Sequence, residues 1–314
     1  MSEQRPARAK RVPVHGVLLL DKPVGFTSNQ VLMQAKRLLN AEKAGHTGTL
    51  DPFASGLLPL CFGEATKFSQ DLLEADKTYE TVVRLGVKTE TGDTEGAVLE
   101  ERAVTCSRDE IEAVLARFRG PIMQVPPMHS ALKRDGKALY EYAREGIVLE
   151  REPRAVTIHE LELLDWQSPL LTLRVRCSKG TYIRVLGEDI GAALGCGGHL
   201  QALRRTGAGS LVVNDATSLD AFAAMEPADR LQALAPVDAL LSSFQAVELD
   251  EAMTARFRQG QRLPLPAGSH AFPAQPSRVR VYGPGHEFLG SAQLQPHGVL
   301  APERLVAPAH AGLI

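Results

Sequence analysis

The pattern of hydrophobic and polar residues predicts a chain that combines strands with helices. Apolar runs bounded by turn-forming residues are typical of strands, and they occur at residues 16–21, 78–86, 156–164 and 170–177. Apolar side chains at helical spacing indicate helices at residues 28–40, 108–118 and 182–194. We expect Ser28 to cap the first helix and residues 165–169 to form a hairpin turn.

Beyond residue 246 the pattern changes to short strand-like pieces. They lie at residues 278–282, 288–294, 299–301 and 305–306, and their spacing suits a small β-barrel. The charge changes in the same part of the chain: residues 215–251 are strongly acidic, whereas residues 252–286 contain arginines but no acidic residue. We therefore predict a domain boundary near Ala246 and a separate C-terminal domain over residues 247–314.

Two further segments are expected to lie outside the core of the main domain, which we place at residues 16–246. Residues 1–15 are rich in arginine and lysine and predict a flexible basic arm. Residues 125–152 begin with a proline-rich stretch, continue through a basic turn and end in a short helical stretch. This composition indicates an insertion or flap.

Composition limits the possible partners. The chain has 314 residues, 44% of them hydrophobic, and a net charge of −2, which are ordinary values for a globular protein. Binding to nucleic acid would therefore depend on local basic patches such as residues 174–205. The alternative interpretation of these patches is a set of solvated faces balanced by nearby acids.

The cysteines and the N-terminal sequence indicate the cellular compartment of the protein. Cysteines 61, 106, 177 and 196 show neither a C-x-x-C pair nor zinc-ligand spacing, so we expect reduced thiols, no metal site and a cytoplasmic protein. The N-terminus lacks the apolar stretch of a secretory signal, and no segment reaches the roughly 18 apolar residues of a membrane span. None of the usual cofactor motifs appears.

Residues 45–52, with the sequence Gly-His-Thr-Gly-Thr-Leu-Asp-Pro, form the most informative motif. Glycine tolerates positive φ, and Pro52 pushes Asp51 out of the helical region. The segment therefore predicts a tight loop that holds one carboxylate in a fixed backbone conformation. Such a loop suits catalysis, although an Asp-Pro turn with a purely structural role has the same pattern.

Three residues are candidate partners of Asp51. Arg184 lies in the first turn of a predicted helix, where the helix dipole does not favour a cation, so we expect it to pair with another charge such as Asp51. Tyr79 enters a predicted strand and can offer its ring to a nucleobase. His46 is a candidate base or stacking ring. The alternatives are a solvent-facing arginine, a packing tyrosine and a histidine that stabilises a turn.

Taken together, the motifs resemble the TruB family of bacterial tRNA pseudouridine-55 synthases. Residues 16–23 resemble the opening motif of this family, and residues 45–59 resemble its catalytic loop. Further matching stretches follow in order at residues 63–67, 76–79, 130–133, 136–140, 178–184 and 199–205. The tail from Glu248 resembles a PUA-type RNA-binding barrel less strongly.

The resemblance implies an α+β pseudouridine synthase fold around a mixed, mostly antiparallel sheet, followed by a PUA-like β-barrel. It implies that residues 125–152 are an RNA-gripping insertion. It also implies that Asp51 is the catalytic aspartate, that Arg184 forms an ion pair with it and that Tyr79 stacks on the target base. His46 corresponds to the residue beside the flipped nucleotide. Pocket positions correspond to Lys22, Tyr182 and Leu203.

The activity that the resemblance implies is isomerisation of uridine 55 in the tRNA T-stem-loop to pseudouridine by a monomer that flips the base and needs no cofactor. Asp51 could attack C1′, stabilise positive charge there or remove a sugar proton, and the sequence does not choose among these roles. The alternatives are a guide-RNA-dependent pseudouridine synthase and a non-catalytic protein that binds or folds tRNA. A serine or cysteine hydrolase is disfavoured, because no G-x-S-x-G elbow or Cys/His signature is present.

Overall fold

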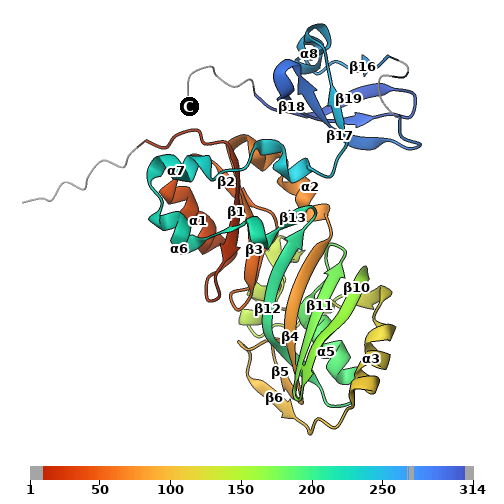
Figure 1. Cartoon of the computed structure of the whole chain (residues 1–314). Coiled ribbons are helices and arrows are strands. Elements are labelled where there is room, and N and C mark those ends of the chain that lie inside the picture. The colour runs from red at the N-terminus through yellow and green to blue at the C-terminus, as the bar shows by residue number, and fades with distance from the viewer. Residues whose placement is uncertain (1–9, 267, 269–271, 308–314) are drawn as a thin grey trace, which may run out of the picture.

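The computed structural model describes residues 10–266, 268 and 272–307 and places them in two bodies (Figure 1). The larger body is built around one long sheet, and the smaller body follows it near the C-terminal end of the chain. Strands and helices occur in both bodies, in agreement with the expected α+β class.

The main sheet has the strand order β14-β1-β3-β12-β4-β11-β10-β7, with β2 and β13 paired beside it. The bounds are β1 (Gly16–Lys22), β2 (Ala44–His46), β3 (Ser55–Phe62), β4 (Lys77–Leu85), β7 (Gly120–Gln124), β10 (Arg154–Gln167), β11 (Leu170–Cys177), β12 (Gly198–Ala208), β13 (Leu211–Val212) and β14 (Thr217–Ser218). Only β1–β14 and β3–β12 pair in parallel among these strands. The sheet is therefore mixed and mostly antiparallel, as predicted.

The register of β4 brings site residues together from three neighbouring strands. Tyr79 of β4 lies opposite Val175 of β11 on one side and opposite Arg205 of β12 on the other. The analysis of the sequence did not identify β3 or β12 as strands. Neither strand has a clean alternation of apolar and polar residues, because β3 contains a glycine and a proline and β12 contains glycines and paired arginines.

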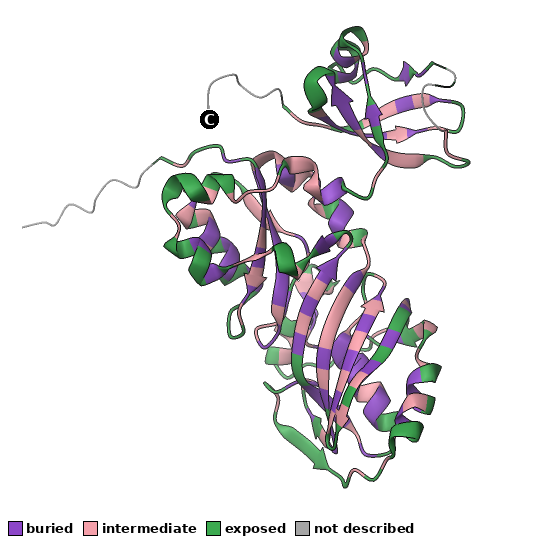
Figure 2. Ribbon diagram, viewed as in Figure 1, coloured by how far each residue is buried: buried purple, intermediate pink, exposed green. Residues whose placement is uncertain are grey.

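Helices cover the sheet in two groups (Figure 1). Near β1 lie α1 (Ser28–Leu38), α6 (Leu219–Ala224) and α7 (Pro227–Gln232), while α3 (Arg108–Arg117) and α5 (Ile183–Ala193) pack on the sheet at β10 and β12. Buried and partly exposed positions alternate along β11, and the outer faces of the helices are exposed (Figure 2). The core thus lies between the sheet and these helices.

The first helix begins differently from the prediction. Its N-cap is Thr27, whose hydroxyl accepts a hydrogen bond from the Gln30 amide while the Gln30 side chain accepts from the Thr27 amide. Ser28 is the first helical residue, and its hydroxyl binds the backbone of Leu50 instead. The expected hairpin turn is also narrower than residues 165–169, because β10 continues to Gln167.

The segment at residues 125–152 contains only short elements. They are β8 (Lys133–Arg134), β9 (Lys137–Ala138) and α4 (Leu139–Arg144). Strands β8 and β9 pair with each other and are separate from the main sheet. A second separate hairpin is formed by β5 (Val87–Thr89) and β6 (Val98–Glu101), and α2 (Ser69–Glu74) follows the 3-10 helix η1 (Gly63–Lys67).

The C-terminal body has its own sheet and its own apolar core. The strand order is β15-β17-β18-β19-β16, with bounds β15 (Ala246–Glu248), β16 (Leu263–Pro264), β17 (Ser277–Gly283), β18 (Glu287–Leu294) and β19 (Val299–Leu305), and α8 (Glu251–Arg258) packs beside it. The sheet curls into a half-barrel. The pieces expected at 299–301 and 305–306 form one strand, because β19 pairs with β18 along its length across a single irregularity.

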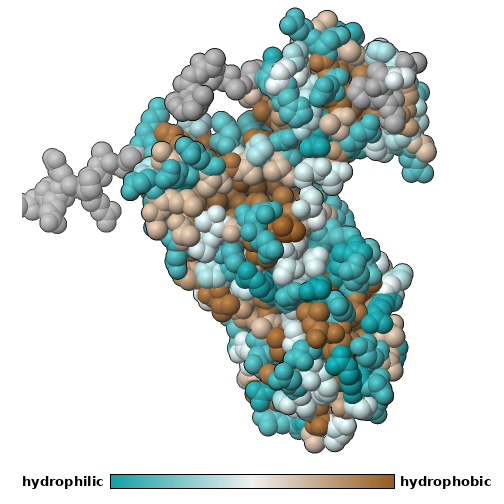
Figure 3. Space-filling view, viewed as in Figure 1, coloured by the Kyte–Doolittle hydropathy of each residue, from teal (hydrophilic) through white to brown (hydrophobic). Residues whose placement is uncertain are grey.

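Side-chain contacts connect the two bodies. Arg278 of β17 pairs with the buried Asp71 of α2, and the rings of Phe288 and Phe68 lie 5.5 Å apart. The hydroxyl of Tyr282 donates a hydrogen bond to a carboxylate of the larger body. Hydrophilic side chains are spread over both bodies on the face in Figure 3, with hydrophobic areas between them.

The start of the described chain contacts the main domain. Of the segment expected to be a flexible arm, residues 1–9 lie outside the described residues. Val12 exchanges backbone hydrogen bonds with Asn40 and Glu42, and the ring of His15 accepts one from the Glu64 amide. Within the described part of the chain, no helix is long and apolar enough to cross a membrane.

Candidate active site

Asp51 lies in the loop between β2 and β3, and contacts with α1 and the segment before it hold this loop. The hydroxyl of Ser28 donates a hydrogen bond to the carbonyl of Leu50 (3.0 Å) and accepts one from the Leu50 amide (2.9 Å). The carbonyl of Pro52 accepts a hydrogen bond from the Gly25 amide (2.8 Å). The residues on both sides of Asp51 are therefore fixed by groups from a distant part of the sequence.

Two glycines allow β12 to approach the loop and β3 closely. Gly48 and Gly56 have φ values of 101° and 103°, a left-handed conformation that glycine adopts without strain. A Cβ atom at Gly56 would overlap the backbone oxygen of Arg205. Only glycine fits at the point where β3 meets β12, and this contact places Arg205 beside the Asp51 loop.

Arg184 is buried at the start of α5 and forms the ion pair that the sequence predicted. Its Nε lies 3.0 Å from Oδ2 of Asp51. The same guanidinium donates hydrogen bonds to the carbonyls of Thr91 (3.0 Å) and His129 (2.7 Å), and its Nη1 lies 3.6 Å from Oδ2 of Asp93. The side chain of Arg184 is 6% exposed and that of Asp93 is 3% exposed, so this network is almost dry.

The charge state of Asp51 follows from opposing effects. Burial raises the pKa of Asp51 above its ordinary value of 3.8, because the ionised form loses water. Arg184 and Lys22 act in the opposite direction, while the negative charge of Asp93 adds to the rise of the pKa. The side chain of Asp51 keeps 37% exposure, so its carboxylate is held by Arg184 and still faces open space.

That space is a cavity of about 340 Å³ lined by Asp51 and Arg184. Three other predicted residues, Tyr79, Tyr182 and Leu203, also line it. Burial raises the pKa of both tyrosines, so their hydroxyls are protonated at neutral pH. Aromatic and apolar side chains beside one carboxylate suit a flat heterocycle such as a nucleobase.

The structure does not place Lys22 and His46 in the lining of this cavity. Lys22 is completely buried, and its ammonium donates hydrogen bonds to the carbonyls of Pro23 (2.8 Å) and Phe26 (2.7 Å). Burial lowers the pKa of Lys22 to about 8, with Asp51 opposing this effect. Burial also lowers the pKa of His46, so its ring is neutral at neutral pH. Lys22 thus holds the chain next to the Asp51 loop.

Sequence reasoning missed four buried polar residues around the site, namely Lys77, Asp93, Gln124 and Arg205. Gln124 accepts a hydrogen bond from the Tyr182 amide (3.0 Å) and thereby fixes the start of α5. Asp93 belongs to a polar segment that was predicted only as a loop, and Arg205 to a basic stretch that was interpreted as a surface patch. The sequence shows that these two residues are charged, but their burial depends on segments far away in the sequence.

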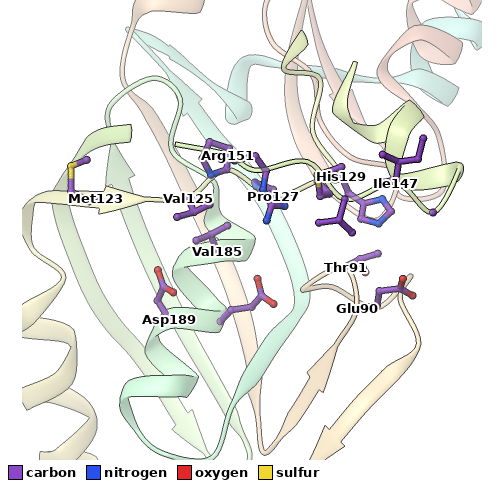
Figure 4. Close-up of a pocket in the computed structure, with 16 residues that line it drawn as sticks. Glu90, Thr91, Met123, Val125, Pro127, His129, Ile147, Arg151, Val185 and Asp189 are labelled. Atoms are coloured by element: carbon purple, nitrogen blue, oxygen red, sulfur yellow. The ribbon is translucent and has the colours of Figure 1, made fainter. Parts of the chain in front are cut away.

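A larger cavity of about 630 Å³ lies between the insertion and α5 (Figure 4). Figure 4 shows Pro127 and Arg151 on the side of the insertion and Asp189 on the side of α5. Burial raises the pKa of Asp189 and of its neighbour Glu188. Asp51 does not line this cavity, so we assign the candidate active site to the smaller one.

The site offers ion pairs and backbone carbonyls rather than a metal-binding cluster. Among residues 10–266, 268 and 272–307, no group of three or more His, Cys, Asp or Glu side chains is placed to hold a metal ion. All four cysteines are free. What the arrangement supplies is one carboxylate, oriented by a buried arginine, at the wall of a cavity that is open to solvent on one side.

Comparison with known proteins gives a consistent result along the whole chain. Residues 36–183 match the TruB family pseudouridylate synthase N-terminal domain, residues 184–242 the tRNA pseudouridylate synthase B C-terminal domain, and residues 246–306 the C-terminal domain of pseudouridine synthase II TruB. A tRNA pseudouridine synthase B of Burkholderia lata is 61% identical over 98% of this chain and 95% of its own length. One of Ralstonia nicotianae is 59% identical over 98% and 99%.

Solved structures show the same fold. A chain in a Cbf5-Nop10-Gar1 complex superposes with a TM-score of 0.75 at 28% identity, covering 94% of this chain and 85% of that chain. A chain in an H/ACA RNP bound to a substrate RNA containing 2′-deoxyuridine gives a TM-score of 0.74 at 25% identity, covering 94% and 86%. The chain therefore has the pseudouridine synthase fold and belongs to the TruB family of pseudouridylate synthases.

Proposed function

We propose that this protein is a tRNA pseudouridine synthase that isomerises uridine 55 in the T-loop of tRNA to pseudouridine. The observation that carries the proposal is the ion pair between Asp51 and Arg184 at the wall of a cavity that Tyr79 and Leu203 also line. The curated relatives that are about 60% identical over nearly the whole chain carry the name tRNA pseudouridine synthase B.

The reaction is an isomerisation, so the site needs no second substrate to donate or accept a group. The N1–C1′ bond of the uridine breaks, the uracil turns, and C5 bonds to C1′. An ionised Asp51 can attack C1′, stabilise positive charge there or remove a proton from the sugar. All three roles require the carboxylate form, which the adjacent guanidinium of Arg184 stabilises.

The remaining cavity walls would hold the base. A uridine inside a folded T-loop must leave its stack to enter a cavity, and an aromatic ring compensates for part of the lost stacking by about 1–3 kcal/mol. Tyr79 is placed to provide this ring, with Leu203 and Tyr182 as further walls. Enclosure also prevents the detached uracil from escaping into water. For His46 we propose a place at the edge of this pocket, next to the nucleotide. For the buried Lys22 we propose a supporting position behind the pocket, where its ammonium donates to the Pro52 carbonyl beside Asp51.

The proposal extends to the other parts of the chain. Residues 125–152 would grip the T-stem-loop, since Lys133 and Arg134 are exposed on the β8–β9 hairpin and can contact phosphates. Residues 247–314 would form the PUA-like RNA-binding domain, residues 16–246 the catalytic domain and residues 1–15 a basic arm. We propose that the enzyme acts as a monomer in the cytoplasm.

The test is the release of tritium from a tRNA transcript labelled at C5 of uridine. The purified chain is incubated with the transcript in EDTA without added cofactor, and a second transcript has the T-loop target uridine replaced. We expect release from the first transcript and none from the second. Release that persists after replacement of the target would refute the assignment of uridine 55.

The same assay separates the alternatives. A guide-RNA-dependent enzyme would release no tritium from the bare transcript until a guide RNA is added. A non-catalytic tRNA-binding or tRNA-folding protein would bind the transcript and release none under any of these conditions. Either result, obtained with folded protein, would overturn the proposed function.

A further inference from the structure

Arg205 is a buried cation in the active site that takes no part in the Asp51–Arg184 pair. Its side chain is only 1% exposed and is among the largest fully buried side chains of the described residues. It lies on β12 two positions after Leu203, so both side chains point to the same face of the sheet, and both line the cavity.

The guanidinium of Arg205 has neutral partners. Its Nε donates a hydrogen bond to the carbonyl of Leu57 (2.7 Å), and its Nη2 donates to the carbonyl of Gly48 in the Asp51 loop (3.2 Å). On the sheet it lies opposite Tyr79, and its charge opposes the rise in the pKa of the Tyr79 hydroxyl. In the described part of the chain, the ion pairs of this region involve Arg184 and Arg204, and none involves Arg205.

A buried charge without a counter-ion has a high energetic cost. Its presence in the active site therefore indicates that the charge contributes to function. The charge of Arg205 acts on groups in and around the cavity: it contributes to lowering the pKa of Lys22, His46 and Lys77, and it opposes the rise in the pKa of Tyr79. A preorganised cation in a dry site stabilises negative charge that develops there during a reaction.

The other two lysine or arginine side chains that line the cavity cannot fill this role equally well. Arg184 lies against the carboxylates of Asp51 and Asp93, which neutralise it. The ammonium of Lys77 donates hydrogen bonds to three carbonyls at 3.1, 2.6 and 2.6 Å, and burial lowers its pKa to about 8. Arg205, in contrast, forms no ion pair with a carboxylate among the described residues, and its guanidinium presents a planar fork of donors.

We propose that Arg205 stabilises the uracil anion that exists between cleavage of the N1–C1′ bond and formation of the C5–C1′ bond. This inference rests on the proposed function. When the N1–C1′ bond breaks, its electron pair stays on the uracil and spreads over N1 and the two carbonyl oxygens. After the ring turns, an electron pair at C5 forms the new bond to C1′, C5 loses its proton and N1 gains one. The positive charge of Arg205, which lines the cavity opposite Tyr79, lowers the energy of the anion.

The test compares uridine with 5-fluorouridine at the target position of otherwise identical ligated tRNAs. Fluorine withdraws electrons from the ring, so the fluorinated anion depends less on the protein for stabilisation. Single-turnover rates of consumption of the target nucleoside are measured by chromatography of digested RNA, at a pH at which both bases are neutral. The enzymes are the wild type and the variants Arg205→Gln, Arg205→Lys and Arg204→Gln.

We expect Arg205→Gln to slow the uridine reaction on the order of a hundredfold. The fluorouridine reaction should slow less. The ratio of the fluorouridine rate to the uridine rate should therefore rise about threefold or more above its wild-type value. Arg205→Lys keeps the charge, and its ratio should stay at the wild-type value even if both rates fall. Arg204→Gln is the matched control on the same strand, because Arg204 pairs with Asp21 (2.6 Å) and should leave the ratio unchanged.

If Arg205→Gln slowed the reactions of both substrates equally, the inference would be overturned, and the role of Arg205 would be limited to packing. Thermal melting and tRNA binding of each variant check that it is folded, and Arg205→Met serves as the neutral variant if the glutamine protein does not fold. A changed ratio in a folded Arg205→Lys protein would also contradict a role of the charge. If the wild type forms no pseudouridine from uridine, the proposed function fails instead.

Discussion

The loop that carries Asp51 and the insertion at residues 125–152 differ in how firmly the rest of the chain holds them. The loop is bound directly by Ser28 of α1, by Arg184 of α5 and by Arg205 of β12. The regular elements of the insertion are a hairpin of two two-residue strands and a six-residue helix, and a cavity of about 630 Å³ separates it from α5.

The difference shows two ways of placing functional groups. A carboxylate that must meet one atom of a substrate needs a fixed position, and several segments determine it jointly. A surface that follows a long polyanion can be built from short exposed elements that adjust to it. Arg184 contacts both regions, because it pairs with Asp51 and donates to the carbonyl of His129 in the insertion (2.7 Å). The comparison therefore predicts that changes in the first region remove turnover and that changes in the second weaken substrate binding.

The largest effect is expected for Asp51→Asn. The amide keeps the shape of the side chain but cannot attack C1′, stabilise positive charge or accept a proton as a carboxylate does. We expect kcat to fall on the order of 10⁴-fold or more while the Kd for tRNA changes little. Single-turnover tritium release and filter binding measure the two quantities. Turnover near the wild-type rate would refute the role of Asp51.

Arg184→Ala should have the next largest effect, because it removes charge from a nearly dry network. The variant leaves Asp93 buried without its cation and frees Asp51 to rotate. Breaking a buried ion pair costs about 3–5 kcal/mol, and we expect the lower end here because Asp51 keeps contact with solvent. Chemical denaturation measures the loss of stability, and kcat should fall about a hundredfold or more.

Arg184→Lys is the matched control for this variant. It keeps one positive charge but cannot reach Asp51, Thr91 and His129 together, since an ammonium lacks the planar fork of a guanidinium. We expect it to recover most of the stability and little of the kcat. Full recovery of kcat would show that charge alone, and not the orientation of Asp51, is what Arg184 supplies.

Asp93→Asn should change the pH dependence of the reaction. The negative charge of Asp93 contributes to raising the pKa of Asp51, so its removal should lower that pKa. If Asp51 acts as the proposed carboxylate, activity is lost as the pH falls through this pKa. The acid limb of the kcat/KM profile should therefore move to lower pH in the variant. An acid limb that moves to higher pH, or does not move, would contradict this electrostatic link.

These residues also show what the sequence could predict. The pairing of Asp51 with Arg184 was predictable, because an aspartate in a fixed turn and an arginine at the wrong end of a helix each point to a partner. The main strands followed from apolar runs bounded by turns. The strands β3 and β12 did not, since Gly56 and the arginines of β12 are explained only when the two strands lie side by side.

The missing site residues have the same cause. Lys77, Asp93 and Arg205 are charged, and charged residues are usually exposed, so the sequence favoured a surface position. Distant segments supply partners for two of them, because Arg205 donates to the carbonyls of Leu57 and Gly48 and Asp93 lies beside Arg184. The partners of Lys77 are carbonyls close to it in the sequence. Local patterns predict the type of an element, whereas burial of a polar group depends on the tertiary fold.

Lys137→Ala tests the other side of the comparison and should have the smallest effect. Lys137 lies in the insertion, where its ammonium is 2.6 Å from the carboxylate of Glu145. Exposed pairs contribute little to stability, so the Tm should not change. If the insertion binds tRNA phosphates as proposed, loss of this cation should raise the KM for tRNA a few fold and reduce the slope of binding against salt by about one, with kcat unchanged. Lys36→Ala on α1, outside the insertion, is the control and should change neither quantity. If Lys137→Ala lowered kcat and left KM intact, the insertion would belong to the framework that positions Asp51, and the distinction between the two regions would not hold.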